Sequence, residues 1–139
     1  MKRTWSAILL CLAFAACESP SAWSEELVIE SRAAQTVADS ATVEGATGGV
    51  VVHGVYRAPS TGFTLRAYYD LTGNDVTLNV GGYPPVSGGT HPAINGQGYR
   101  ISIPLPAGTY NVRVMHHDQG TGDPNARNVT LTNVVVGRN

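Results

Sequence analysis

Beyond Gly49, apolar and polar residues alternate along much of the chain, and this alternation restricts the fold more than any other feature. A period of two places every second side chain on the same face of a β-strand, as expected for strands with one buried and one solvated face. Segments rich in Gly, Pro, Asn and Asp separate the apolar runs, as turns would. The runs that we interpret as strands are residues 50–56, 63–70, 76–80, 99–103, 110–114 and 129–136.

No segment of this part of the chain has a helical period, so the sequence predicts an all-β protein, an antiparallel β-sandwich of six to seven strands. A seventh strand would come from residues 86–94 or from the segment before Gly49. The turn residues 72–75 lie between two alternating runs and predict a hairpin there.

Length and charge limit the classes of function. The chain has 139 residues, which is too short for two ordinary domains. Its formal net charge is −1, and no aromatic and basic surface motif is evident, so a nucleic-acid partner is not expected.

The N-terminus reads as a signal peptide over residues 1–16. Lys2 and Arg3 precede an apolar run over residues 5–16 that is too short to span a bilayer. The run ends at Cys17 and resembles a bacterial lipoprotein signal, which implies that Cys17 is lipidated and becomes the mature N-terminus. Glu18 in second place resembles the signal for outer-membrane sorting, with the protein facing the periplasm. Ordinary cleavage after residues 13–15 would instead release a soluble secreted protein.

Residues 17–49 are interpreted as a lipidated, flexible tether before a sandwich domain at residues 50–139. This segment is acidic, rich in Ser, Ala and Thr, and has one apolar cluster at residues 27–29. A short strand at residues 26–30 that joins the sheet is the alternative. Cys11 leaves with the signal, so we expect no disulfide in the domain.

Residues 97–114 resemble the carboxypeptidase regulatory-like domains, whose fold is a transthyretin-like sandwich that shares its turn with immunoglobulin-like families. The shared pattern is Gly-x-Tyr, an alternating strand, Pro-x-Gly-x-Tyr and a second alternating strand. We expect Pro106 to preset the turn, Gly108 to relieve backbone crowding, and the Tyr110 hydroxyl to reach the backbone. The resemblance implies a structural or binding module rather than a catalyst.

The histidines are the candidate metal ligands, together with Met115 and Asp118. Alternation places Met115 and His117 on one face of a strand and His116 on the other, so a metal site would need His53 or His91 to converge on them. Exposed histidines at strand ends are the preferred interpretation. Residues 118–125 have oxygen ligands and glycines, but they lack the distal bidentate Glu of a calcium loop. No metal and no cofactor are therefore predicted.

The segment from residue 81 to residue 98 is long for a loop in a small domain, and long loops are often functional. Tyr83, His91, Asn95 and Tyr99 are its candidate ligand-binding residues, because tyrosine rings stack on sugars or peptide side chains. A surface excursion packed on the sheet edge is the preferred alternative.

Catalytic signals are weak, and we do not expect an enzyme. Ser87 lacks the glycine and the strand-to-helix context of a nucleophile elbow. Four aspartates of the domain, Asp70, Asp75, Asp118 and Asp123, read as turn residues rather than as a catalytic pair.

The sequence therefore predicts a cell-envelope lipoprotein whose β-sandwich is a non-catalytic binding or structural accessory module. The expected partners are the membrane, through the lipid anchor, and an envelope protein or glycan, and an edge strand could dock a peptide by strand addition. Two alternatives stay open: a small periplasmic metal-binding or hydrolytic protein that uses the histidines, and a secreted protease inhibitor that presents the long loop.

Overall fold

A computed structural model describes residues 25–85, 94–118 and 126–139. In these residues the chain forms β-strands and no helix, and none of the described segments is a helix long and apolar enough to cross a membrane. The strands are β1 (Glu25–Leu27), β2 (Ile29–Ala33), β3 (Ser40–Ala46), β4 (Gly49–Ala58), β5 (Thr64–Thr72), β6 (Asp75–Tyr83), β7 (Asn95–Pro104), β8 (Gly108–Asp118) and β9 (Arg127–Val136).

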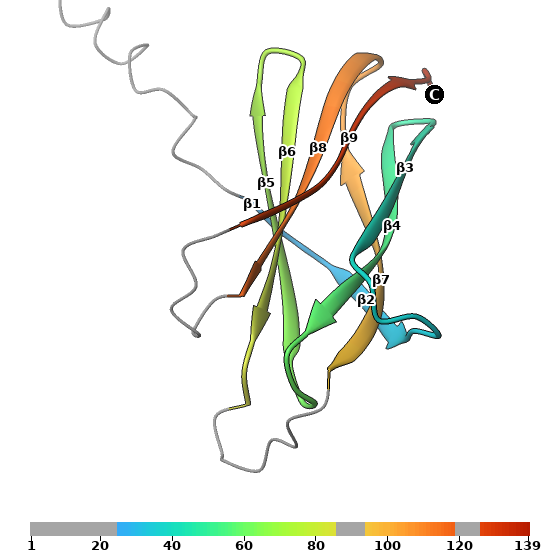
Figure 1. Cartoon of the computed structure of the whole chain (residues 1–139). Coiled ribbons are helices and arrows are strands. Elements are labelled where there is room, and N and C mark those ends of the chain that lie inside the picture. The colour runs from blue at the N-terminus through green and yellow to red at the C-terminus, as the bar shows by residue number, and fades with distance from the viewer. Residues whose placement is uncertain (1–24, 86–93, 119–125) are drawn as a thin grey trace, which may run out of the picture.

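The strands form two sheets, which confirms the predicted all-β sandwich (Figure 1). One sheet has the order β1-β5-β6-β8-β9 and the other has the order β2-β7-β4-β3. The described residues contain nine strands instead of the expected six to seven. Every pair is antiparallel except β6 and β8, which are parallel because the chain leaves the first sheet after β6, runs through the second sheet as β7, and returns in the same direction as β8.

The prediction of a flexible tether over residues 17–49 is wrong for residues 25–46. β1 pairs with β5, β2 pairs with β7, and β3 pairs with β4, so this segment belongs to both sheets. Leu27 and Ile29 pack against the core, while Val28 between them is 85% exposed where the chain crosses from one sheet to the other (Figure 1). The segment resembles a linker in sequence because so few of its side chains face inward.

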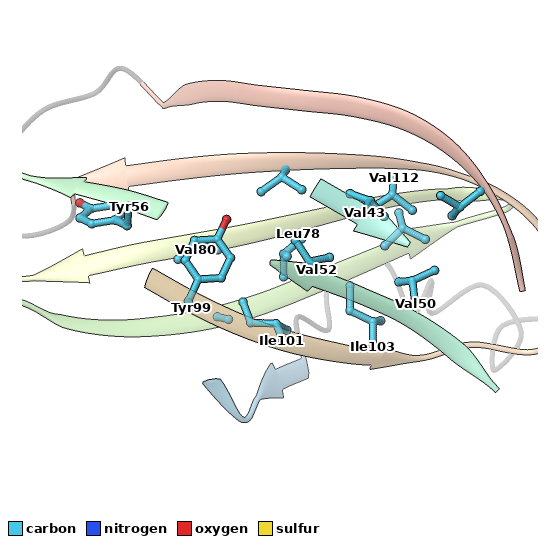
Figure 2. Packing of buried hydrophobic residues seen from close by; sticks show 14 of the residues in the cluster. Val43, Val50, Val52, Tyr56, Leu78, Val80, Tyr99, Ile101, Ile103 and Val112 are labelled. Atoms are coloured by element: carbon cyan, nitrogen blue, oxygen red, sulfur yellow. The ribbon is translucent and has the colours of Figure 1, made fainter. Parts of the chain in front are cut away.

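The core lies between the sheets and follows the alternation of the sequence. The predicted hairpin is present as β5 and β6, with Gly73 in the turn at a φ of 60°. Figure 2 shows the aliphatic side chains that fill the space between the two layers. The fully buried members of largest volume are Tyr56, Tyr99, Leu78, Ile101, Ile103, Val50, Val52, Val76, Val80, Val112 and Val114.

Both lateral sides of the sandwich are joined. On one side the chain itself passes from β1 to β2. On the other side β3 lies against β9, so closely that a side chain at Gly45 would overlap the Val135 carbonyl group. Backbone hydrogen bonds continue this contact, from the Gly137 N–H to the Ala46 carbonyl (3.1 Å) and from the Gly48 N–H to the Gly137 carbonyl (3.2 Å).

The turn before β8 confirms one expectation and corrects another. The Tyr110 hydroxyl donates a hydrogen bond to the Pro106 carbonyl oxygen at 2.7 Å, as predicted. Gly108 relieves no crowding, since a Cβ atom built there would come no closer than 3.5 Å to the Tyr110 ring, an ordinary contact.

In contrast, the residues around Gly54 leave no space for a side chain at this position. Gly54 faces inward from β4, and a Cβ atom there would overlap the Tyr99 ring and lie 2.6 Å from the Ser40 carbonyl oxygen. The absence of a side chain at residue 54 thus makes room for a large ring on the neighbouring strand.

The variant Gly54→Ala should therefore lower the free energy of unfolding by about 2 kcal/mol, the usual cost of overpacking a filled core. The matched variant Gly108→Ala should change it by less than about 0.5 kcal/mol. Urea titration of both variants measures the difference. Equal effects would show that Tyr99 does not occupy the position described.

Candidate functional site

The predicted ligand-binding loop is shorter than the sequence indicated. β6 continues to Tyr83 and β7 begins at Asn95, and both of these side chains are half-buried at the strand ends. Tyr99 is only 1% exposed and lies between the layers (Figure 2), so its prediction as a ligand-binding residue is wrong. His91 lies outside the described residues.

The histidines of the described residues lie in separate places. His53 is on β4 in the four-stranded sheet, where it pairs with Thr42 and Arg100. His116 and His117 are on β8 in the five-stranded sheet and face opposite sides, as alternation predicts. Among residues 25–85, 94–118 and 126–139, no three His, Cys, Asp or Glu side chains are arranged to hold a metal ion. Asp118 ends β8, whereas residues 119–125 of the calcium-like loop and Cys17 lie outside the described residues.

His116 is the centre of the most distinctive group of polar side chains in the structure. It faces inward from β8 and is 0% exposed, which corrects the expectation of an exposed histidine, and among the described residues it is the one polar or charged residue that is fully buried. A buried imidazole is costly unless both ring nitrogens form hydrogen bonds. The surroundings of His116 must therefore provide one partner on each side.

One strand and one loop provide these partners. The His116 Nε2 atom lies 2.8 Å from the hydroxyl of Tyr99 on β7, in the opposite sheet. The His116 Nδ1 atom lies 2.6 Å from the Oδ1 atom of Asp39, just before β3. We assign the neutral tautomer in which Nδ1–H donates to Asp39 and Nε2 accepts from the Tyr99 hydroxyl, because every polar atom is then satisfied.

Arg127 connects this chain of hydrogen bonds to a second carboxylate. Its Nε atom donates to Asp39 Oδ2 at 2.7 Å, and its Nη1 atom donates to Asp118 Oδ2 at 2.8 Å. The Tyr56 hydroxyl donates to Asp118 as well, and the Arg127 guanidinium lies 5.2 Å from the centre of the Tyr56 ring. We call Asp39, Tyr56, Tyr99, His116, Asp118 and Arg127 the His116 cluster.

An irregularity in β9 places Arg127 in this cluster. The pairing of β8 with β9 shifts between Val114 and Met115, so that His116 lies opposite Arg127. Without the extra residue in β9, Asn128 would lie opposite His116. Arg127 would then project from the other face of the sheet, since a shift of one residue reverses the direction of a side chain.

Burial and hydrogen bonding shift the pKa values of the cluster. Burial lowers the pKa of His116, although its hydrogen bond to Asp39 opposes this effect. Burial raises the pKa of Asp39, but hydrogen bonds from the Arg57 N–H, His116 and Arg127 outweigh it, and the net pKa is lowered. Burial, followed by the nearby carboxylates, raises the pKa of both Tyr56 and Tyr99. At neutral pH the cluster thus contains a neutral imidazole, and the Arg127 guanidinium pairs with Asp39 and Asp118.

The order hydroxyl, imidazole, carboxylate is also that of a hydrolytic triad. Here, however, the hydroxyl belongs to Tyr99, which is buried between the two layers, so a substrate cannot reach it in this conformation. A recess of about 210 Å³ opens at the outer end of the cluster, lined by Arg57, Pro59, Ile94, Asp118 and Arg127. Of the residues that line it, Asp118 and Arg127 are already paired with each other.

Sequence reasoning found His116, Tyr99 and Asp118 but missed that they meet, and it missed Tyr56, Asp39 and Arg127 altogether. Asp39 lies in the segment that was interpreted as a tether. Arg127 lies beyond the clear alternation of residues 129–136, and nothing in the sequence marks the extra residue in β9. The one available signal is the inward position of His116, which requires unidentified partners.

No protein-family model matches the chain, and no curated protein or solved structure is detectably similar to it.

Replacing Arg127 with Met should lower the free energy of unfolding by about 2 kcal/mol, because two largely buried carboxylates lose their counter-charge. The control is Arg66→Met, which removes an arginine whose Nε and Nη2 atoms donate to the two carboxylate oxygens of Glu26 on the exposed surface. Its effect on unfolding should be much smaller. Chemical denaturation measures both, and a similar loss in the two variants would contradict a structural role of the His116 cluster.

Stability should also decrease as the pH falls from 7.5 to 5. In the unfolded chain His116 binds a proton near its ordinary pKa of 6.5, whereas in the folded chain burial lowers this pKa. The contribution of neutral His116 to the free energy of unfolding is fully present above pH 6.5 and decreases as the pH falls toward the lowered pKa of His116 in the folded state. The Asp39 contribution is lost only at more acidic pH, because its ordinary pKa is 3.8. Unfolding titrations of His116→Gln should show a flatter dependence, with His53→Gln as the matched control.

Proposed function

We propose that this chain is a cell-envelope lipoprotein whose β-sandwich serves as a non-catalytic binding or structural accessory module. The observation that most directly supports a non-catalytic role is that both ring nitrogens of His116 form hydrogen bonds inside the fold. The cluster that most resembles catalytic machinery thus connects the two sheets and the segment before β3. Its groups hold the module together and leave the outer faces of the sheets for recognition.

The outer face of the five-stranded sheet has side chains suited to recognition of an envelope protein or a glycan. Arg66 lies between the rings of Tyr68 and Tyr83, at 5.6 and 5.7 Å from their centres. Along the same face, Asn133 donates to Asn111 at 2.9 Å, and Asn111 donates to an aspartate of β6 at 3.0 Å. Ordered amides and rings on the face of a sheet are groups that hydrogen-bond and stack on sugars or extended peptides.

The anchor in this proposal is Cys17, and its distance from the sandwich limits where the module acts. β1 begins at Glu25, so the connecting residues 18–24 are few. Seven residues span at most roughly 25 Å when fully extended. An anchored module would therefore act close to the membrane surface, which we propose to be the periplasmic face of the outer membrane.

The variant Cys17→Ala tests the anchor. In a Gram-negative host, the parent chain should incorporate a labelled fatty acid and sediment with the membranes, whereas the variant should lose both properties. Ser21→Ala, a change in the same connecting residues, serves as the matched control and should behave as the parent. Mass spectrometry of the mature protein should show diacylglyceryl and acyl groups on Cys17. A soluble parent chain that begins at residue 16 would contradict the proposal and favour secretion.

A further inference from the structure

β2 forms an edge of the four-stranded sheet. Among the described residues it pairs with β7 alone, through five residues from Ile29 to Ala33. All of these residues except Ile29 are exposed. An edge strand presents backbone N–H and C=O groups that can pair with another strand, and proteins usually protect such edges.

The charges on β2 are arranged in a way that decides what can pair with this edge. Glu30 and Arg32 lie two residues apart and therefore project from the same face of the strand. Arg32 packs its side chain over Gly98 on β7, and Glu30 lies 3.8 Å from Arg100. Both charged side chains thus stand on the outer face of the four-stranded sheet.

We propose that the chain forms a homodimer in which β2 pairs antiparallel with β2 of a second copy, about a two-fold axis at Ser31. In this register Glu30 lies opposite Arg32 of the second copy, and Arg32 lies opposite Glu30. Ile29 lies opposite Ala33 in the same way. The two four-stranded sheets then become one continuous sheet, with two opposite-charge pairs across the new contact.

The order of Glu30 and Arg32 along β2 favours a second copy of the chain over a partner of unrelated sequence. A parallel pairing in the same register would place Glu30 opposite Glu30 and Arg32 opposite Arg32, which is unfavourable. A strand of unrelated sequence would match both charges only by chance, whereas a second copy matches them by symmetry. The contact is small, so we expect a weak dimer that forms more readily when both copies share one surface and their effective concentration is high. The pairing itself uses no residue of the anchor.

A cysteine at the symmetry axis provides the first test. In antiparallel pairs, directly opposite Cα atoms are about 4.5–5.5 Å apart, which suits a disulfide. Ser31→Cys in the full chain, in membranes of an expressing host, should therefore form a disulfide-linked dimer on mild oxidation. Thr42→Cys is the matched control, because Thr42 is also exposed on an edge strand of the same sheet. The parent chain controls for Cys11 and Cys17.

Charge reversal provides the second test, in the Ser31→Cys background. Arg32→Glu alone and Glu30→Arg alone each place like charges opposite each other twice, and each should reduce the rate of cross-linking about tenfold. The double exchange Glu30→Arg with Arg32→Glu restores two opposite pairs and should return the rate to within about twofold of the parent. Circular dichroism of each variant shows whether the sandwich is folded.

The outcomes separate clearly. A Ser31 cross-link that is no faster than the Thr42 cross-link would overturn the proposal. A double exchange that is folded and still fails to cross-link would overturn it as well. If one single variant does not fold, the other single variant and the neutral variant Arg32→Gln, which should show an intermediate rate, decide the result. Because the anchor is tested separately through Cys17, failure of dimerisation leaves the proposed location unaffected.

Discussion

The burial of His116 is the constraint on which the rest of this structure depends. An imidazole enclosed between two sheets must be satisfied from both sides, and no neighbour on its own strand can do this. Asp39 comes from 77 residues earlier in the chain, and Tyr99 comes from the opposite sheet. The N-terminal segment, β7 and β8 are therefore required to meet at one point. One polar group in an apolar core thus fixes the relative position of three distant segments.

A complementary fit of large and small residues places the rings of this cluster. Tyr99 occupies the space left by Gly54, and Tyr56 occupies the space left by Gly82 in the opposite sheet. Each ring is held at its hydroxyl end, Tyr99 by His116 and Tyr56 by Asp118. Because a hydrogen bond fixes the tip and a glycine accommodates the ring, neither tyrosine is free to take another position. The packing and the polar contacts therefore depend on one another.

Much of the fold follows from local patterns, and the cluster does not. The alternation over residues 63–70 and 76–80 specifies β5 and β6, and the turn before β8 specifies the Tyr110 hydrogen bond, since both involve neighbours in sequence. β3 escaped prediction, and β1 and β2 were foreseen only as the alternative of one short strand at residues 26–30, because this segment contributes few inward apolar side chains to sheets built by other segments. Arg127 escaped because one extra residue in β9 reverses its direction. Local patterns determine which residues face inward, but they do not determine which distant residues meet.

The two lateral sides of the sandwich are closed in different ways. β3 and β9 contact each other directly, and hydrogen bonds at Gly48 and Gly137 close that side. On the other side the chain itself crosses between the sheets at Val28, and among the described residues β2, which carries opposite charges, pairs with β7 alone. A segment that was predicted to be a spacer thus completes both sheets. Since it also lies next to the connection to Cys17, whatever this edge binds would be held near the proposed anchor.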